Sequence, residues 1–148
     1  MKDVGELMED TSSLAESILE QIADAVIYAD DKGTIRRWND AAAALFGYSA
    51  AEALGQNLDL IIPEHLRAAH WRGFEAAITN GVTKLQGRPT VTRATHQTGR
   101  KLYVEMTFAL VKGQAGGAVA VARDVTEHVE EQRADAHAMD AAKEGVER

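Results

Sequence analysis

Hydrophobic residues recur every three or four positions in the first segment of the chain, which is the spacing of an amphipathic helix. The stripe consists of Val4, Leu7, Thr11, Leu14 and Ile18. Residues 10–13 are polar and can divide this helix in two, because short polar side chains compete for backbone hydrogen bonds. Residues 1–20 are therefore predicted to form an amphipathic segment that precedes the main domain.

Two short hydrophobic runs follow, over residues 24–30 and 33–39. The residues Asp30–Gly33 that join them are typical of a tight turn, with glycine where a positive φ is expected. This pattern predicts a β-hairpin.

The next segment contains residues typical of helix caps but no long periodic stripe of apolar residues. Asn39 or Asp40 can cap a short alanine-rich helix that Gly47 ends. Ser49 can cap a second short helix, which Gly55 stops. Small helices are therefore predicted between the hairpin and residue 63.

A longer helix is predicted over about residues 63–79, with Pro63 at its first turn. Leu66, His70 and Phe74 recur at i, i+4 and i+8 on one face, so a histidine stands in the middle of an apolar stripe. Burying an imidazole without a partner costs about 1–3 kcal/mol. The pattern alone leaves two explanations, a hydrogen bond within the core or a bound metal, and it favours the hydrogen-bonded core histidine.

The period changes to two in the C-terminal half. Apolar residues occupy every second position and so share one face of a predicted strand. They are Leu102, Val104, Met106, Phe108 and Leu110. A strand over about residues 84–96 precedes this one, and another over residues 117–122 follows a glycine-rich turn. Together with the hairpin, they predict an α+β fold in which a five-stranded antiparallel sheet carries small helices on one face and amphipathic helices at both ends.

Residues 126–148 return to helical spacing, but polar residues interrupt the heptad-like seam. This pattern predicts a signalling-type coiled coil or an exposed terminal helix. The chain is thus expected to divide into an N-terminal helix (1–20), a central domain (21–125) and a C-terminal helix (126–148).

The composition argues against several classes of function. A net charge of −7 leaves no basic surface for nucleic acid, and no segment resembles a membrane span or a signal peptide, so we expect a cytoplasmic protein. The chain has no cysteine, so any metal would be held by His, Met or oxygen donors. Nucleophile-elbow, phosphate-loop and zinc-protease motifs are missing from the sequence, which argues against an enzyme.

Several short phrases of the sequence together resemble the PAS family. Gly33–Ile35, Trp38–Asn39, Phe46–Tyr48 and Leu54–Gln56 are similar to the first half of a bacterial PAS domain, and Asp124–Thr126 is similar to its exit motif. The likeness spans residues 18 to about 127. It implies a PAS fold whose last strand leads directly into an output helix.

Residues 63–70 resemble the haem-binding subset of this family, the FixL-type and DosP-type oxygen sensors. The resemblance implies haem b as the cofactor and gives His70 the role of proximal iron ligand, which leaves the sixth position for oxygen, carbon monoxide or nitric oxide. His65 lies about 140° away around the helix and is the weaker candidate. The cofactor-binding residues expected from the resemblance are Leu66, His70, Phe74, Leu85, Arg88, Thr90, Met106 and Phe108.

The chain departs from both types of sensor on the distal side. By gapless matching, Thr90 stands where FixL-type sensors have an arginine, and Arg88 stands where DosP-type sensors have a methionine. Arg88 could pair with an iron-bound ligand or a propionate, Thr90 could donate a hydrogen bond, and Met106 could approach the iron. The sequence therefore does not decide which of Arg88, Thr90 and Met106 would face the iron-bound ligand.

The resemblance implies a sensor of a diatomic gas or of redox state, a homodimer formed through the terminal helices, and an output partner or domain outside this sequence. The alternative is a PAS module without haem, which serves dimerisation or protein interaction, or which binds flavin or another small molecule. The lack of cysteine excludes the adduct-forming flavin photocycle but not flavin redox sensing.

Overall fold

The computed structural model describes residues 4–113 and 116–147, with side chains described for 12–113, 116–143 and 145. Each predicted helix and strand has a counterpart, and the differences lie in the bounds. In chain order the elements are α1 (Val4–Gln21), β1 (Ala25–Ala29), β2 (Ile35–Trp38), α2 (Asp40–Phe46), α3 (Ala50–Ala53), the 3₁₀ turns η1 (Leu58–Leu60) and η2 (Glu64–Leu66), α4 (Arg67–Asn80), β3 (Thr90–Thr95), β4 (Lys101–Leu110), β5 (Ala118–Asp124) and α5 (Thr126–Glu147).

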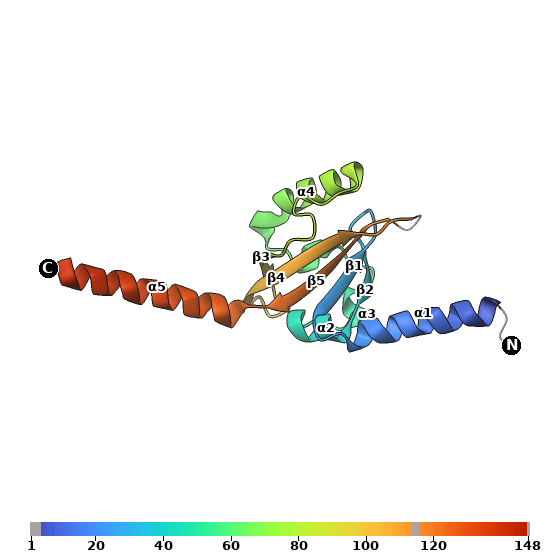
Figure 1. The fold of residues 1–148 in the computed structure, drawn as a ribbon, viewed down its shortest axis with the longest axis horizontal. Coiled ribbons are helices and arrows are strands. Elements are labelled where there is room, and N and C mark those ends of the chain that lie inside the picture. The colour runs from blue at the N-terminus through green and yellow to red at the C-terminus, as the bar shows by residue number, and fades with distance from the viewer. Residues whose placement is uncertain (1–3, 114–115, 148) are drawn as a thin grey trace.

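A five-stranded antiparallel sheet forms the body of the domain (Figure 1). Its order is β2-β1-β5-β4-β3, so the last strand lies between the N-terminal hairpin and the other two C-terminal strands. Paired residues in neighbouring strands share a face of a sheet. The pairs Thr90↔Met106 and Met106↔Ala122 therefore form one row on the inner face, and Phe108↔Ala120 begins another. The predicted fold class is confirmed.

The core lies between the inner face of this sheet and the small helices. Its largest fully buried side chains are Phe46, Ile35, Leu102 and Val104. Residues of β4 alternate as predicted, since Leu102, Val104 and Met106 are buried whereas Tyr103 is only partly covered. Burying each large apolar side chain contributes about 1.5–3 kcal/mol, so the core holds the sheet to the small helices.

The N-caps of α2 and α3 and the C-cap of α2 are among those that the sequence predicted, whereas α3 ends at Ala53 with Leu54, not Gly55, as its C-cap. The Asn39 side chain accepts a hydrogen bond from the Ala42 N–H at the start of α2, and Gly47 ends this helix with a φ of 83°. Ser49 and Glu52 form a reciprocal capping box at α3. Each such cap is worth about 1 kcal/mol, so local chemistry fixes where these helices begin and end.

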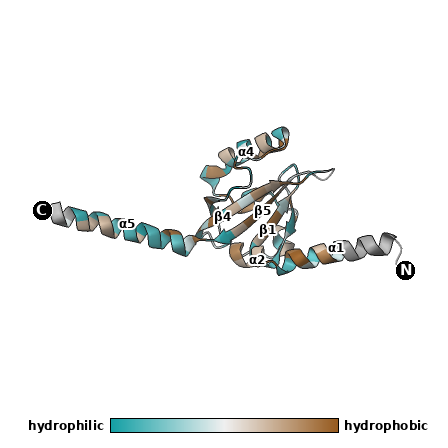
Figure 2. Ribbon diagram, in the orientation of Figure 1, coloured by the Kyte–Doolittle hydropathy of each residue, from teal (hydrophilic) through white to brown (hydrophobic). Residues whose placement is uncertain are grey.

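The two terminal helices extend away from the sheet toward opposite ends of the molecule (Figure 1). The prediction that residues 10–13 break the first helix is wrong, because α1 is continuous through them. The part of its stripe that precedes residue 12 lies outside the described side chains. Leu14 and Ile18 are exposed, and α5 is exposed from residue 130 to residue 143 and largely hydrophilic (Figure 2).

Two of the differences in bounds affect the candidate site: the start of β3, which follows the longer helix, and the start of the longer helix itself. The predicted strand over 84–96 begins only at Thr90, because the segment after α4 turns at Gln86 and Gly87, both with positive φ, and Pro89 has no N–H for a strand ladder. Residues 64–66 form a 3₁₀ turn and α4 starts at Arg67. His70 therefore lies in the first turn of α4 rather than in the middle of a helix.

Candidate functional site

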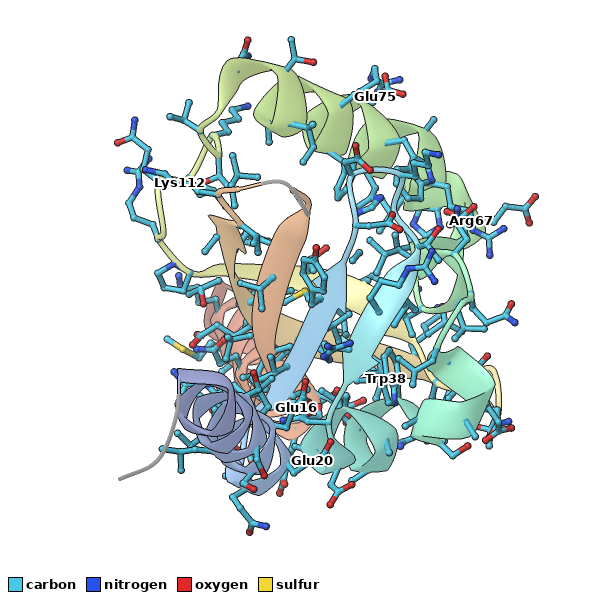
Figure 3. All side chains as sticks on the ribbon, turned by 90° about the vertical axis from the view of Figure 1, so that its right-hand side faces the viewer. Glu16, Glu20, Trp38, Arg67, Glu75 and Lys112 are labelled. Atoms are coloured by element: carbon cyan, nitrogen blue, oxygen red, sulfur yellow. The ribbon has the colours of Figure 1, made fainter. Side chains whose placement is uncertain are left out.

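A cavity of about 500 Å³ lies between the inner face of the sheet and α4. Strands β1, β3, β4 and β5 contribute to one wall, and α4 with the residues before and after it forms the other. Figure 3 shows α4 as an arch over the strands, marked by Arg67 and Glu75. Volumes of about 300–1,000 Å³ are usual for small-molecule sites, so this cavity is large enough for a ligand.

The predicted site residues, with one exception, line this cavity. The residues brought together there are Leu66, His70, Phe74, Leu85, Thr90, Met106 and Phe108. The exception is Arg88, which is exposed in the segment between α4 and β3 and whose Nε donates to the Leu85 carbonyl at 3.0 Å. The structure therefore does not place Arg88 with the others, because it belongs to a turn and not to the strand that gapless matching assumed.

Three alanines that were not among the predicted site residues also line the cavity, and their small side chains leave space for a ligand. Ala118 and Ala120 line it from β5, and Ala69 lines it from α4. The sequence carried a signal for the first two, because alanine alternates with valine in residues 118–121 and small side chains on an inner sheet face leave space above them. Lys84, an exposed residue, is the one lysine among the described residues of the mostly apolar lining.

Helix α4 presents its apolar side to the cavity and not to the core. None of its 14 residues is buried. The helix is held at its N-terminal end, where Arg67 donates from Nε to the Ile62 carbonyl at 3.0 Å and from Nη2 to the Asp59 carbonyl at 3.2 Å. An amphipathic helix normally buries its apolar stripe against a neighbour, so the stripe of α4 is available to a bound molecule.

His70 stands on this stripe with its ring against two other aromatic residues. Its ring centroid lies 4.7 Å from that of Trp71 and 6.1 Å from that of Phe74. Burial lowers the pKa of His70, and the charge of Asp59 opposes this effect only in part, so the imidazole is neutral near pH 7.

In the part of the chain that the structure describes, His70 lacks the hydrogen bond expected of a core histidine. The Nδ1 atom of His70 is enclosed and finds no hydrogen-bond partner among the described residues. A neutral imidazole beside an apolar cavity can act as a ligand to the metal of a bound cofactor. Within the described part of the chain, no group of three or more His, Asp or Glu side chains could hold a metal ion by itself.

The sheet forms one wall of the cavity, and a helix follows its last strand directly. Residues 13–125 match the PAS fold, and the chain belongs to the PAS family. PAS domains are generally sensory modules and not catalytic ones. The resemblance of the sequence phrases to this family is thereby confirmed.

Two curated relatives are sensors. The sensor protein FixL of Bradyrhizobium diazoefficiens is 32% identical over 119 residues, which cover 78% of this chain and 23% of FixL. The oxygen sensor protein DosP of Escherichia coli is 30% identical over 111 residues, which cover 73% of this chain and 14% of DosP. The chain thus spans less than a quarter of the length of either relative.

A solved structure with the same fold is that of an RNA-binding light-oxygen-voltage receptor. It is 25% identical, with a TM-score of 0.66, and the match covers 86% of this chain and 37% of the receptor chain. The PAS fold of this chain is therefore shared with that receptor. Among the described residues, no helix is both long and apolar enough to cross a membrane.

Proposed function

We propose that this PAS sensor domain binds haem b in the cavity between α4 and the sheet, with His70 as the protein ligand of the iron, and that it senses a diatomic gas or the redox state of the haem. The observation that carries the proposal is the position of His70, whose ring borders an apolar cavity and whose Nδ1 has no hydrogen-bond partner among the described residues. The relatives named as the sensor FixL and the oxygen sensor DosP support it.

The residues at the cavity fit a haem. Its porphyrin is a flat and mostly apolar body, which Leu66, Phe74, Leu85 and Phe108 would cover. Lys84 would be available to a propionate, because it is an exposed lysine among the residues that line the cavity. When bound, the haem would supply an iron whose open position takes oxygen, carbon monoxide or nitric oxide.

The distal side of this site would be formed by Thr90 and Met106. These residues are cross-strand partners in β3 and β4 and share the inner face of the sheet, opposite the helix that carries His70. Thr90 offers a hydroxyl donor, and Met106 offers a thioether that can approach the iron. Arg88 is left out of this set, because its guanidinium bonds within its own turn.

The signal would pass through β4 to α5. The inner face of β4 carries Met106 and Phe108, and its residue Tyr103 is bonded to Thr126 at the head of α5. A ligand that favours one arrangement of β4 would therefore bias the helix that follows the sheet. The partner or domain that receives the signal is expected outside this sequence.

A homodimer through the terminal helices belongs to the same proposal. Leu14 and Ile18 in α1, and Ile22 directly after it, recur every fourth residue and are 61%, 51% and 37% exposed. A second copy would cover this stripe and remove it from water. Light scattering tests the point, because Ile18→Glu should turn a dimer into a monomer at micromolar concentration, whereas Lys32→Glu, at an exposed turn, should not. A wild-type monomer would refute the dimer.

Absorption spectroscopy tests the haem site. The purified chain, titrated with haem, should give a Soret band that His70→Ala loses and His65→Ala retains, because His65 is exposed on η2 and does not line the cavity. A wild-type protein without this band refutes the haem proposal, and a band that survives His70→Ala removes His70 from its role. A flavin spectrum in the purified protein would support the flavin-binding alternative instead.

A further inference from the structure

Trp71 lies outside the cavity lining, on the flank of the proposed iron ligand. Its ring meets that of His70 nearly edge-on, with an interplanar angle of 78° and a centroid distance of 4.7 Å. It meets the ring of Phe74 in the same way, at 76° and 5.3 Å. The indole therefore contacts two of the residues through which α4 lines the cavity, His70 and Phe74.

A hydrogen bond from outside the helix holds the indole in this position. Trp71 Nε1 donates to Oδ1 of Asp59 at 2.8 Å, and the same oxygen lies 4.0 Å from Nε of Arg67. Asp59 belongs to η1, whose first turn is capped by Asn57. A bond to a charged acceptor is among the stronger hydrogen bonds in proteins, so Asp59 ties the aromatic group to a fixed point of the backbone.

A glycine makes the room that the indole occupies. A Cβ added at Gly33 would overlap the six-membered ring of Trp71. The Gly33 carbonyl also accepts a hydrogen bond from the Leu58 N–H, which brings the β1–β2 turn and η1 together on this side of α4. Trp71 is thus enclosed by the turn on one side, by Asp59 at its nitrogen and by His70 at its edge.

From this arrangement we infer that Trp71 and Asp59 are positioning residues for His70, which fix the direction of its imidazole toward the cavity. The inference rests on the proposed function, since it concerns the ligand of the haem iron. Groups just outside the ligands of a metal orient them, and their loss typically weakens metal binding by about 10- to 100-fold. Here the support runs through an aromatic contact and a carboxylate, and not through a hydrogen bond to the imidazole itself.

The test compares Trp71→Phe and Asp59→Asn with wild type, all loaded with haem. Phenylalanine keeps an aromatic ring beside His70 but loses the N–H, and asparagine keeps an acceptor oxygen but loses the charge. The control is Glu75→Gln, which removes a carboxylate from the exposed side of α4. Resonance Raman spectra of the ferrous proteins report the iron–histidine stretching frequency, and transfer of haem to an acceptor protein reports its dissociation rate.

We expect the iron–histidine frequency to shift and haem to dissociate about 10-fold faster in both variants, with no change in the control. In the protein without haem, nuclear Overhauser contacts between the His70 and Trp71 rings should weaken in Asp59→Asn. Variants with wild-type frequency and wild-type haem dissociation would overturn the positioning role. A wild-type protein that takes up no haem would instead overturn the proposed function, so the two failures are distinct.

Discussion

Thr126, the first residue of α5, is bonded to the backbone of Tyr103 in β4 through its hydroxyl. Its Oγ1 accepts from the Tyr103 N–H at 2.9 Å and donates to the Tyr103 carbonyl at 3.4 Å. The same carbonyl accepts from the Val125 N–H at 2.8 Å, and Asp124 accepts from the Thr126 N–H at 2.9 Å. One backbone position of the strand that lines the cavity thus anchors the head of the terminal helix.

Thr126→Val should loosen this anchor while it preserves the shape of the side chain. Loss of the hydroxyl leaves the partly buried Tyr103 N–H without its partner, which costs about 1–2 kcal/mol. We expect faster hydrogen exchange in the first turn of α5 and a lower free energy of unfolding in urea. Thr126→Ser keeps the hydroxyl and is the matched control. Equal exchange in the valine and serine variants would show that the hydroxyl does not hold the helix.

Asn39 links α1, β1 and α2 through a single buried amide. It is 3% exposed, its Oδ1 accepts from the N–H groups of Val26 and Ala42, and its Nδ2 donates to the carbonyls of Leu19 and Asp24. Asn39→Ala removes all four bonds and should lower the free energy of unfolding by at least about 2 kcal/mol.

Asn39→Asp separates the two halves of this network. The carboxylate can still accept from Val26 and Ala42, but it cannot donate to Leu19 and Asp24. Hydrogen exchange should therefore increase at the C-terminal end of α1 and remain slow at the start of α2. Asn57→Asp, at an exposed cap, serves as the control for the added charge. Uniform loosening of both helices in Asn39→Asp would contradict this division of roles.

The parts of the fold that the sequence predicted are those that neighbouring residues determine. Asn39 and Gly47 set the ends of α2 by bonds to residues a few positions away, and the alternation along β4 follows from the pleat of one strand. His70 and Phe74 could be assigned to one face by helical period alone, and that face lines the cavity. Local rules were sufficient for these features.

The parts that the sequence did not predict depend on contacts between distant segments. Arg88 was placed on a strand by counting residues, but the backbone turns at Gln86 and Gly87 and carries it away from the cavity. The bond between Trp71 and Asp59 joins residues 12 positions apart in different elements. No periodicity or cap signals such a contact, because it depends on how η1 and α4 pack together.

Gly33→Ala tests how closely that turn packs on Trp71. Gly33 has a φ of 82° and Gly55 has a φ of 85°. Alanine at either position would therefore adopt a left-handed backbone conformation, which destabilises the folded state by about 1–2 kcal/mol. A Cβ at Gly55 meets nothing within 4 Å, whereas a Cβ at Gly33 overlaps the Trp71 ring. Urea unfolding should show a larger loss for Gly33→Ala than for Gly55→Ala.

The emission of Trp71 gives a second measure of the same contact. Gly33→Ala should shift the tryptophan emission to longer wavelength, because the displaced indole gains contact with water, and Gly55→Ala should leave it unchanged. Trp38 is buried, 4% exposed, and contributes a constant background to both spectra. Equal stability and equal emission in the two variants would mean that Trp71 moves aside at no cost.

Asp30 makes the stability of the hairpin turn depend on pH. Burial acts to raise the pKa of Asp30, but the N–H groups of Thr34 and Lys32, each at 3.0 Å from Oδ1, together with Arg36 at 3.2 Å from Oδ2, outweigh it and lower the pKa below the ordinary 3.8. The folded chain then holds this proton less tightly than the unfolded chain. Its contribution to stability is therefore full above pH 3.8 and is lost as the pH falls through the lower folded value.

Asp30→Asn should remove this dependence, because asparagine keeps an acceptor for the turn but does not titrate in this range. The variant should be less stable than wild type in urea at pH 6, and the difference should shrink as the pH falls below 3.8. Asp31→Asn is the matched control, since Asp31 is the exposed neighbour in the same turn. If the difference between Asp30→Asn and wild type stayed constant from pH 6 to pH 2.5, the N–H groups would not be favouring the ionised carboxylate.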